Sequence, residues 1–197
     1  MTVYTYDEKG KYTIPVRAMI CSTGLDNSTI TGDYTIGIKS EWLSLVGDVF
    51  GRYISGISGD YLFHSVPYYS MSEEDLELAE FNKLGEQASQ GCVRLAVSDA
   101  KWVYDNCPTG TNVSIYDDAE NAGPLGKPDA IKITDFTNKW DPTDSNKKCP
   151  YAKATPIISG ANDYTIKSGG EFYALAGVTA VDTCGNDITS NIEVSAM

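Results

Sequence analysis

Cys92 and His64 are the two residues best suited to covalent chemistry. Cys92 directly follows Gly91 and opens a short apolar segment, so its thiol can stand exposed on a tight loop. His64, the only histidine, ends the apolar segment 61–63, and an imidazole is the usual acceptor of a thiol proton near neutral pH. The pair would suit acyl transfer, with the N–H groups of Gly91 and Cys92 forming an oxyanion hole.

These residue types alone leave a structural alternative open, in which a buried histidine packs beside a buried cysteine. For a single histidine and an arbitrary cysteine, this structural arrangement is commoner than a catalytic pair. A structural zinc site is not expected, because the chain has one His and no Cys-x-x-Cys spacing. We expect no cofactor.

The composition excludes several classes of partner. The 197 residues carry a formal net charge of −12, which repels nucleic acids and anionic lipid headgroups. No run reaches the roughly twenty apolar residues that a membrane span needs. The chain begins like a strand, without a basic, apolar signal core, so we expect any targeting segment to be missing from it. Thirteen tyrosines and strand-like alternation favour a β-rich extracellular protein.

Short strands and two helices are the elements expected to position the pair. A helix is expected from Ser72 to Leu84, and a second from Asp99 to Asn106 with Ser98 as its cap. Pro15 predicts an edge or a bulge in its strand. A linker at 119–148 contains a predicted strand at 131–133 and Trp140 as an anchor. The strands expected are 2–6, 12–20, 34–38, 51–57, 61–65, 111–116, 156–158, 164–166, 174–181 and 188–194.

Two motifs in a fixed order resemble the L,D-transpeptidase (YkuD) family. Phe63-His64-Ser65 resembles its strand-borne histidine, and Ser89-Gln90-Gly91-Cys92-Val93-Arg94 resembles its signature Ser-His-Gly-Cys-x-Arg, or the same signature ending in Asn. The flanking segments 21–36 and 98–115 also fit, so the resemblance covers about residues 1–118. It implies a mainly β fold, a sandwich or barrel-like catalytic domain with two helices.

The motif departs from the family pattern in two ways. Gln90 stands where the family commonly has a second histidine. That histidine is not the base, because the residue assigned here as base is His64. Cys92 follows His64 by 28 residues, more than the usual interval. The extra length falls in the predicted helix 72–84, which could form a wall or lid over a substrate groove.

The resemblance implies roles for individual residues. Cys92 would attack the L,D-bond of a peptidoglycan stem peptide and release D-alanine through a thioester. His64 would be the base, and the Ser65 carbonyl would hold its tautomer. Arg94 would bind either a stem carboxylate or a loop carbonyl. Catalytic residues are thus expected to be Cys92, His64, Gly91 and Ser65, and substrate-binding residues Phe63, Ser89, Gln90 and Arg94.

The remaining cysteines fit two disulfides outside the cytoplasm. Cys21 and Cys107 lie in loops that this topology could bring together, and Cys149 and Cys184 bracket the tail, so we predict the pairs Cys21–Cys107 and Cys149–Cys184. Residues 149–197 resemble a bacterial Ig-like module. Such a module has roughly seven strands over about 100 residues, so the tail would be a truncated one.

Three functions remain open at this point. The first is an L,D-transpeptidase, with possible L,D-carboxypeptidase activity, acting on peptidoglycan stem peptides at the cell wall. The second is a sortase-like cysteine transpeptidase. The third is a non-catalytic wall-binding or adhesion module, with the tail a spacer or a surface for wall or self association.

Overall fold

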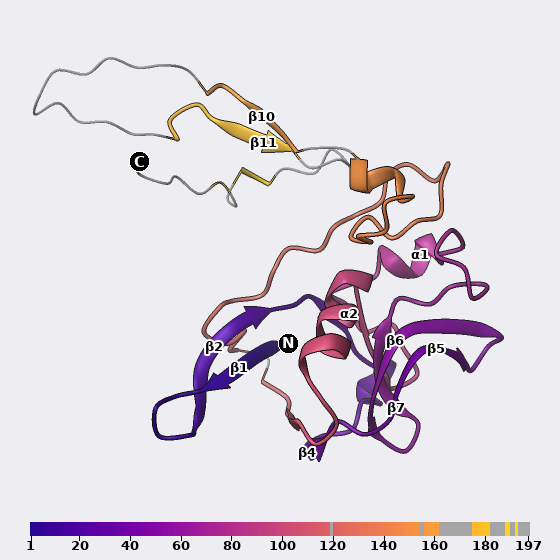
Figure 1. Cartoon of the computed structure of the whole chain (residues 1–197), viewed down its shortest axis with the longest axis vertical. Coiled ribbons are helices and arrows are strands. Elements are labelled where there is room, and N and C mark those ends of the chain that lie inside the picture. Colours follow the sequence, from indigo (N-terminus) through magenta and orange to yellow (C-terminus); the bar gives the residue numbers. More distant parts are fainter. Residues whose placement is uncertain (119, 154–155, 162–174, 182–187, 190–191, 193–197) are drawn as a thin grey trace, which may run out of the picture.

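The computed structural model describes residues 1–118, 120–153, 156–161, 175–181, 188–189 and 192. A five-stranded mixed sheet forms its centre (Figure 1). Strands β7 and β8 run parallel, whereas the other neighbouring strands of this sheet are antiparallel. The order across the sheet is β3 (Cys21–Ser22), β8 (Val93–Leu95), β7 (Tyr61–Ser65), β6 (Val49–Ser58) and β5 (Lys39–Leu45).

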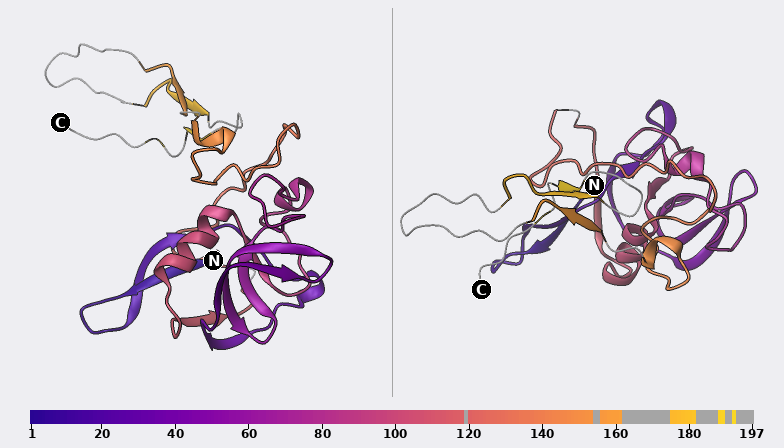
Figure 2. Two further views of the ribbon diagram at one scale, coloured as in Figure 1. Left: turned by 45° about the vertical axis from the view of Figure 1, so that its right-hand side comes forward. Right: turned by 90° about the horizontal axis from the view of Figure 1, so that it is seen from above.

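Helix α2 (Val97–Asn106) packs on this sheet, against β6, β7 and β8 (Figures 1 and 2). Its buried residues are Val97, Ala100 and Val103, spaced three apart and therefore on one helical face. Ala100 and Val103 join a core cluster that includes Phe63 from β7. Helix and sheet together fix the parallel pair β7–β8.

The described residues also form three two-stranded antiparallel sheets. In the first, Pro15 pairs with Tyr4 at a shift of register, which confirms the predicted irregularity. This hairpin extends away from the five-stranded sheet (Figure 1). The pairs are β1 (Thr2–Tyr6) with β2 (Tyr12–Ala18), β4 (Gly32–Thr35) with β9 (Asn112–Ile115), and β10 (Ile157–Ser159) with β11 (Thr179–Val181).

The mainly β architecture with two α-helices is confirmed, but several boundaries differ. The predicted helix 72–84 is wrong in length, because α1 spans only Leu78–Phe81. The backbone N–H of Leu76 donates to Lys139 O and that of Glu77 to Pro67 O, so long-range partners replace helical ones. Strand β5 was missed, and 131–133 does not form a strand. The predicted strand 164–166 and most of 188–194 lie outside the described residues. Two 3-10 helices complete the set, η1 (Leu25–Asn27) and η2 (Pro150–Lys153).

The segment that follows β9 packs against the central region. Trp140 is 5% exposed, which confirms the predicted anchor. Asp141 is fully buried, and its Oδ2 accepts the backbone N–H of Val97 at 2.8 Å. The predicted cap Ser98 is therefore wrong: Ala96 occupies the cap position without a side-chain bond, and a carboxylate 44 residues away takes its place.

The predicted Cys21–Cys107 disulfide is wrong, because both residues carry free thiols. Cys21 is held in β3 opposite Leu95, and Cys107 ends α2, so each is fixed by its own element beside the core. The predicted Cys149–Cys184 pair involves residue 184, which lies outside the described residues. Within the described part of the chain, none of the helices has the length and apolar character needed to span a bilayer.

Candidate active site

The parallel pairing of β7 and β8 brings the two motifs together. Phe63 lies opposite Val93 and His64 opposite Arg94. Because side chains alternate along a strand, Cys92 continues the face of the sheet that carries Arg94 and His64. The register thus places two residues that are 28 positions apart in the chain on the same face of the sheet.

His64 is oriented by its neighbour. Its Nδ1 lies 2.6 Å from the backbone O of Ser65. A carbonyl oxygen only accepts hydrogen bonds, so Nδ1 carries the hydrogen and the lone pair is left on Nε2. A Cβ on Gly51 would lie 3.1 Å from Nδ1, so this glycine on β6 leaves room for the ring.

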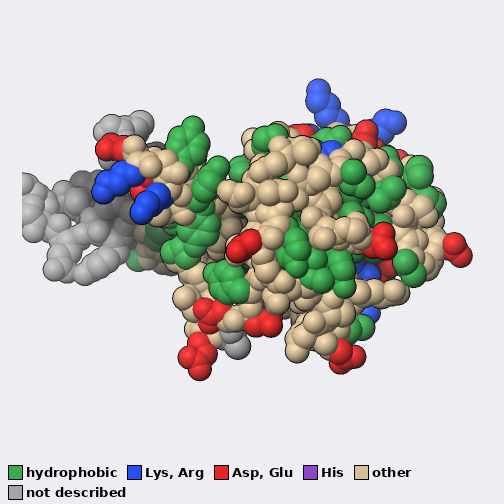
Figure 3. Space-filling model, turned by 90° about the horizontal axis from the view of Figure 1, so that it is seen from below, with side chains coloured by type: hydrophobic (Ala, Val, Ile, Leu, Met, Phe, Trp, Pro, Cys, Tyr) green, Lys and Arg blue, Asp and Glu red, His purple; other side chains and the backbone are tan. Residues whose placement is uncertain are grey.

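Burial keeps the His64 ring neutral. The side chain is only 2% exposed, and no histidine atom is visible on the face shown in Figure 3. Burial lowers the pKa of His64 to about 4; the bond to Ser65 opposes this shift and the positive charge of Arg94 adds to it. At neutral pH the ring is therefore an unprotonated base.

The Ser65 peptide is itself fixed by its side chain. Ser65 Oγ accepts the backbone N–H of Arg52 at 2.9 Å and donates to Val66 O at 2.8 Å. The residue is completely buried. The peptide that contains the carbonyl orienting His64 is held by its own N–H, that of Val66, which donates to Leu95 O at 2.8 Å.

Cys92 is half-buried, and its thiol is neutral at rest. Sγ donates to the backbone O of Asp60 at 3.4 Å. Burial raises the pKa of the thiol; the Leu62 N–H and Arg94 oppose the shift, and Asp60 adds to it. With a neutral thiol and a neutral imidazole, the arrangement suits proton transfer during attack rather than a preformed ion pair.

The loop before Cys92 is organised around Ser89, which is 2% exposed. Ser89 Oγ accepts the Gly91 N–H at 3.0 Å and donates to Cys92 O at 2.6 Å. The expected pairing of the Gly91 and Cys92 amides in an oxyanion hole is therefore wrong for Gly91. Gly91 has a φ of +140°, in the region that favours glycine. The Cys92 N–H has no partner among the described residues.

The predicted substrate-binding residues have different environments. Phe63 packs in the core, Ser89 is buried, and Gln90 is exposed. Arg94 Nη1 pairs with Glu80 Oε2 of α1 at 2.5 Å, a partner that was not expected. Arg94 therefore links the strand of the nucleophile to the segment between the two motifs.

Sequence reasoning missed three residues around the nucleophile: Gly24, Thr29 and Asp60. Thr29 Oγ1 donates to Gly91 O at 2.8 Å and accepts the Gly24 N–H at 2.7 Å. The Thr29–Gly91 bond joins residues 62 positions apart, and the Cys92–Asp60 bond joins residues 32 positions apart, so no local pattern could have indicated either pairing.

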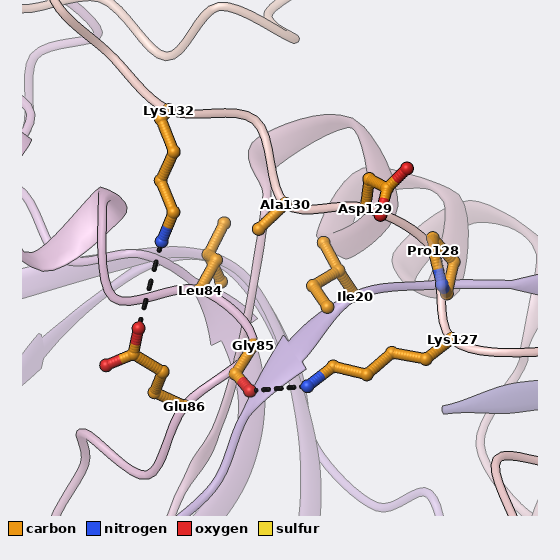
Figure 4. A pocket seen from close by; sticks show the side chains of 9 residues that line it. All are labelled: Ile20, Leu84, Gly85, Glu86, Lys127, Pro128, Asp129, Ala130 and Lys132. Atoms are coloured by element: carbon orange, nitrogen blue, oxygen red, sulfur yellow. Dashed lines mark hydrogen bonds and ion pairs between the residues drawn. The ribbon is translucent and has the colours of Figure 1, made fainter. Parts of the chain in front are cut away.

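A shallow pocket of about 260 Å³ lies apart from these residues (Figure 4). Two lysines lie at its rim, and both are engaged: Lys127 donates to Gly85 O, and Lys132 donates to Asn82 O and lies 3.9 Å from Glu86. We interpret the pocket as a packing seam between the segments 84–86 and 127–132. Within the described ranges, no cluster of three or more His, Cys, Asp or Glu residues is suited to a metal ion.

The catalytic-domain model of one family matches the central region. The L,D-transpeptidase catalytic domain, YkuD, matches residues 1–115, which is more than half of the chain. The chain therefore belongs to this family and carries an L,D-transpeptidase catalytic domain. The match ends at residue 115, so the Ig-like interpretation of 149–197 stays a prediction.

One curated relative is the Bacillus subtilis (strain 168) protein named "Putative L,D-transpeptidase YciB". It is 37% identical over 118 residues, which cover 56% of this chain and 59% of that protein. The chain thus matches about three fifths of this relative's length.

Solved structures give weaker overall matches. A fused Zn-dependent amidase/peptidase/peptidoglycan-binding domain-containing protein from Clostridium acetobutylicum ATCC 824 is 35% identical, covering 49% of this chain and 38% of that chain, with a TM-score of 0.36. An L,D-transpeptidase (Yku) from Stackebrandtia nassauensis is 21% identical, covering 60% and 52%, with a TM-score of 0.42.

Proposed function

We propose that this protein is a cysteine acyltransferase that forms peptidoglycan cross-links. Cys92 attacks an L,D-bond of a stem peptide, D-alanine leaves, and a second stem provides the acceptor amine. One observation carries the proposal: a neutral His64, oriented through Nδ1 by Ser65 O, shares a sheet face with the half-buried thiol. Family membership gives this chemistry its substrate class.

The first half-reaction forms a thioester. The thiol turns from Asp60 O towards His64 Nε2, which takes its proton while Sγ bonds to the acyl carbon. The C–N bond to D-alanine breaks, and the same proton passes to the leaving amine. The Cys92 N–H stabilises the negative oxygen of the tetrahedral intermediate.

The second half-reaction restores the enzyme. The acceptor amine attacks the thioester and gives a proton to His64, and Cys92 leaves as a thiol with that proton. Water in place of the amine would give L,D-carboxypeptidase activity. Arg94, Gln90 and the peptide groups near Phe63 and Ser89 are the proposed contacts for the stem peptide.

The setting follows from this chemistry. A peptidoglycan-acting enzyme belongs in the cell envelope, so we propose an extracellular or cell-wall location. We keep the division into a catalytic domain at 1–118, a connecting segment at 119–148 and a partial Ig-like module at 149–197. The tail then serves spacing, wall attachment or self association.

Mass spectrometry tests the proposal directly. The intact chain is incubated with a tetrapeptide stem, and separately with a carbapenem that acylates the same thiol. We expect a covalent adduct on Cys92, lost in Cys92→Ala and at least tenfold slower in His64→Ala. An unmodified wild-type protein with both reagents would contradict the proposal and favour the sortase-like enzyme or the non-catalytic module.

A further inference from the structure

The peptide bond between Gly91 and Cys92 decides where the Cys92 N–H points, and this N–H has no partner among the described residues. In a trans peptide the C=O and the N–H point in opposite directions. Whatever fixes the Gly91 carbonyl therefore also fixes the direction of the Cys92 N–H. The side chain that contacts this carbonyl is Thr29, at 2.8 Å.

The Thr29 hydroxyl both accepts and donates a hydrogen bond. Its oxygen accepts the Gly24 N–H at 2.7 Å, so its single hydrogen is directed to Gly91 O. The side chain is half-buried. Thr29 thus joins a separate turn of the chain to the peptide that precedes the nucleophile.

Backbone packing holds that turn against the loop. A Cβ on Gly24 would lie 2.9 Å from Gly91 Cα, and a Cβ on Gly91 would lie 3.2 Å from Ser28 O. Gly24 also forms a parallel bridge with Ser89. The two backbones therefore approach closely, which only glycine at both positions allows.

Two further backbone groups of the loop are hydrogen-bonded to one side chain. Ser89 Oγ holds the Gly91 N–H and the Cys92 carbonyl. With Thr29 on the Gly91 carbonyl, the peptide groups on both sides of Cys92 are hydrogen-bonded, and the Cys92 N–H is left to face an acyl oxygen.

We propose that Thr29 is a positioning residue for acylation: its hydroxyl holds the Gly91–Cys92 peptide so that the Cys92 N–H meets the developing oxyanion. This inference rests on the proposed function. It assigns to Thr29 no contact with the substrate and no part in proton transfer.

Two reactions of the same thiol separate this role from a general structural one. Acylation by a carbapenem or a tetrapeptide passes through an oxyanion, whereas alkylation by iodoacetamide does not. In Thr29→Val we expect the single-turnover acylation rate constant to fall about tenfold, with alkylation and the apparent substrate affinity unchanged. Thr29→Ser keeps the hydroxyl and should retain most of the rate.

Thr109→Val is the matched control, because Thr109 Oγ1 also donates to a backbone carbonyl, that of Gly37, at 2.8 Å. It should acylate at the wild-type rate. If Thr29→Val lowers the melting temperature, Thr29→Ala is measured in its place. The inference is overturned if the hydroxyl-free variant acylates like wild type, or if acylation and alkylation fall together. Absence of acylation in the wild type would instead overturn the proposed function.

Discussion

The imidazole of His64 and the backbone carbonyl of Ser65 form a hydrogen bond of 2.6 Å between consecutive residues of one strand. Forming this bond does not require a loop to become ordered, because β7 already fixes both residues. It selects the tautomer whose Nε2 can accept a proton. Burial of the ring then keeps that nitrogen unprotonated at neutral pH.

The chain's only histidine gives one imidazole signal, so NMR can follow its titration without assignment. We expect a midpoint near 4, because burial disfavours the charged ring. Arg94→Met removes a positive charge that lowers the pKa, so the midpoint should rise. Arg17→Met, which removes the partner of Asp99 at 2.6 Å, is the control and should leave it unchanged. A wild-type midpoint near 6.5 would contradict the buried, neutral ring.

Stability should fall in acid because of the same residue. The unfolded chain binds a proton at His64 with a pKa of 6.5 and the folded chain at about 4, so the unfolded state gains protons first. From pH 6.5 down to 4, wild type should lose up to about 3 kcal/mol relative to His64→Gln. Urea unfolding at pH 7 and pH 4.5 measures the difference. Asp141 has a pKa raised to about 6 by burial and works in the opposite direction, but it is present in both proteins and cancels.

Local patterns predicted the parts of the site that are local. The alternation in Thr2–Tyr6 and Tyr61–Ser65 gave the limits of β1 and β7, and the glycine before Cys92 indicated a tight loop. The direction of the Gly91 N–H was predicted wrongly. Periodicity reports burial of a face, but it does not report which hydroxyl, here that of Ser89, a loop amide will meet.

Long-range polar contacts explain the other differences. The apolar spacing in 72–84 is typical of a helix, yet Lys139 and Pro67 take the backbone donors of Leu76 and Glu77. Asp141 caps α2 from outside the family-matched region. The contacts of Lys139 with Leu76 and of Asp141 with Val97 join segments that no sequence window contains together, so propensity alone could not anticipate them.

Arg52 provides a prediction on how the C-terminal segment supports the sheet. Its guanidinium pairs with Asp144 at 3.1 Å, where both side chains are 7% exposed, and with Glu41 at 3.4 Å, which is 59% exposed. We expect Asp144→Asn to lower the free energy of unfolding by about 2 kcal/mol, since a buried charge loses a partner while Glu73 remains. Glu41→Gln, on the same arginine, should change it by less than about 0.5 kcal/mol. If chemical denaturation shows that Asp144→Asn and Glu41→Gln lower the free energy of unfolding equally, burial does not determine the strength of these ion pairs.

Gly91→Ala tests whether the shape of the nucleophile loop sets the rate. The added Cβ would lie 2.7 Å from Tyr61 Cε1 at a φ of +140°, so the loop or the Tyr61 ring must shift. A displacement of about 1 Å at the nucleophile is enough to slow acylation on the order of a hundredfold. Gly110→Ala is the matched control, because its φ of +90° imposes the same kind of backbone strain with nothing within 4 Å of the new Cβ. It should lose about 1 kcal/mol of stability and keep its acylation rate. If both variants acylate alike in stopped-flow measurements with a carbapenem, the close contact between Gly91 and Tyr61 has no part in positioning the thiol.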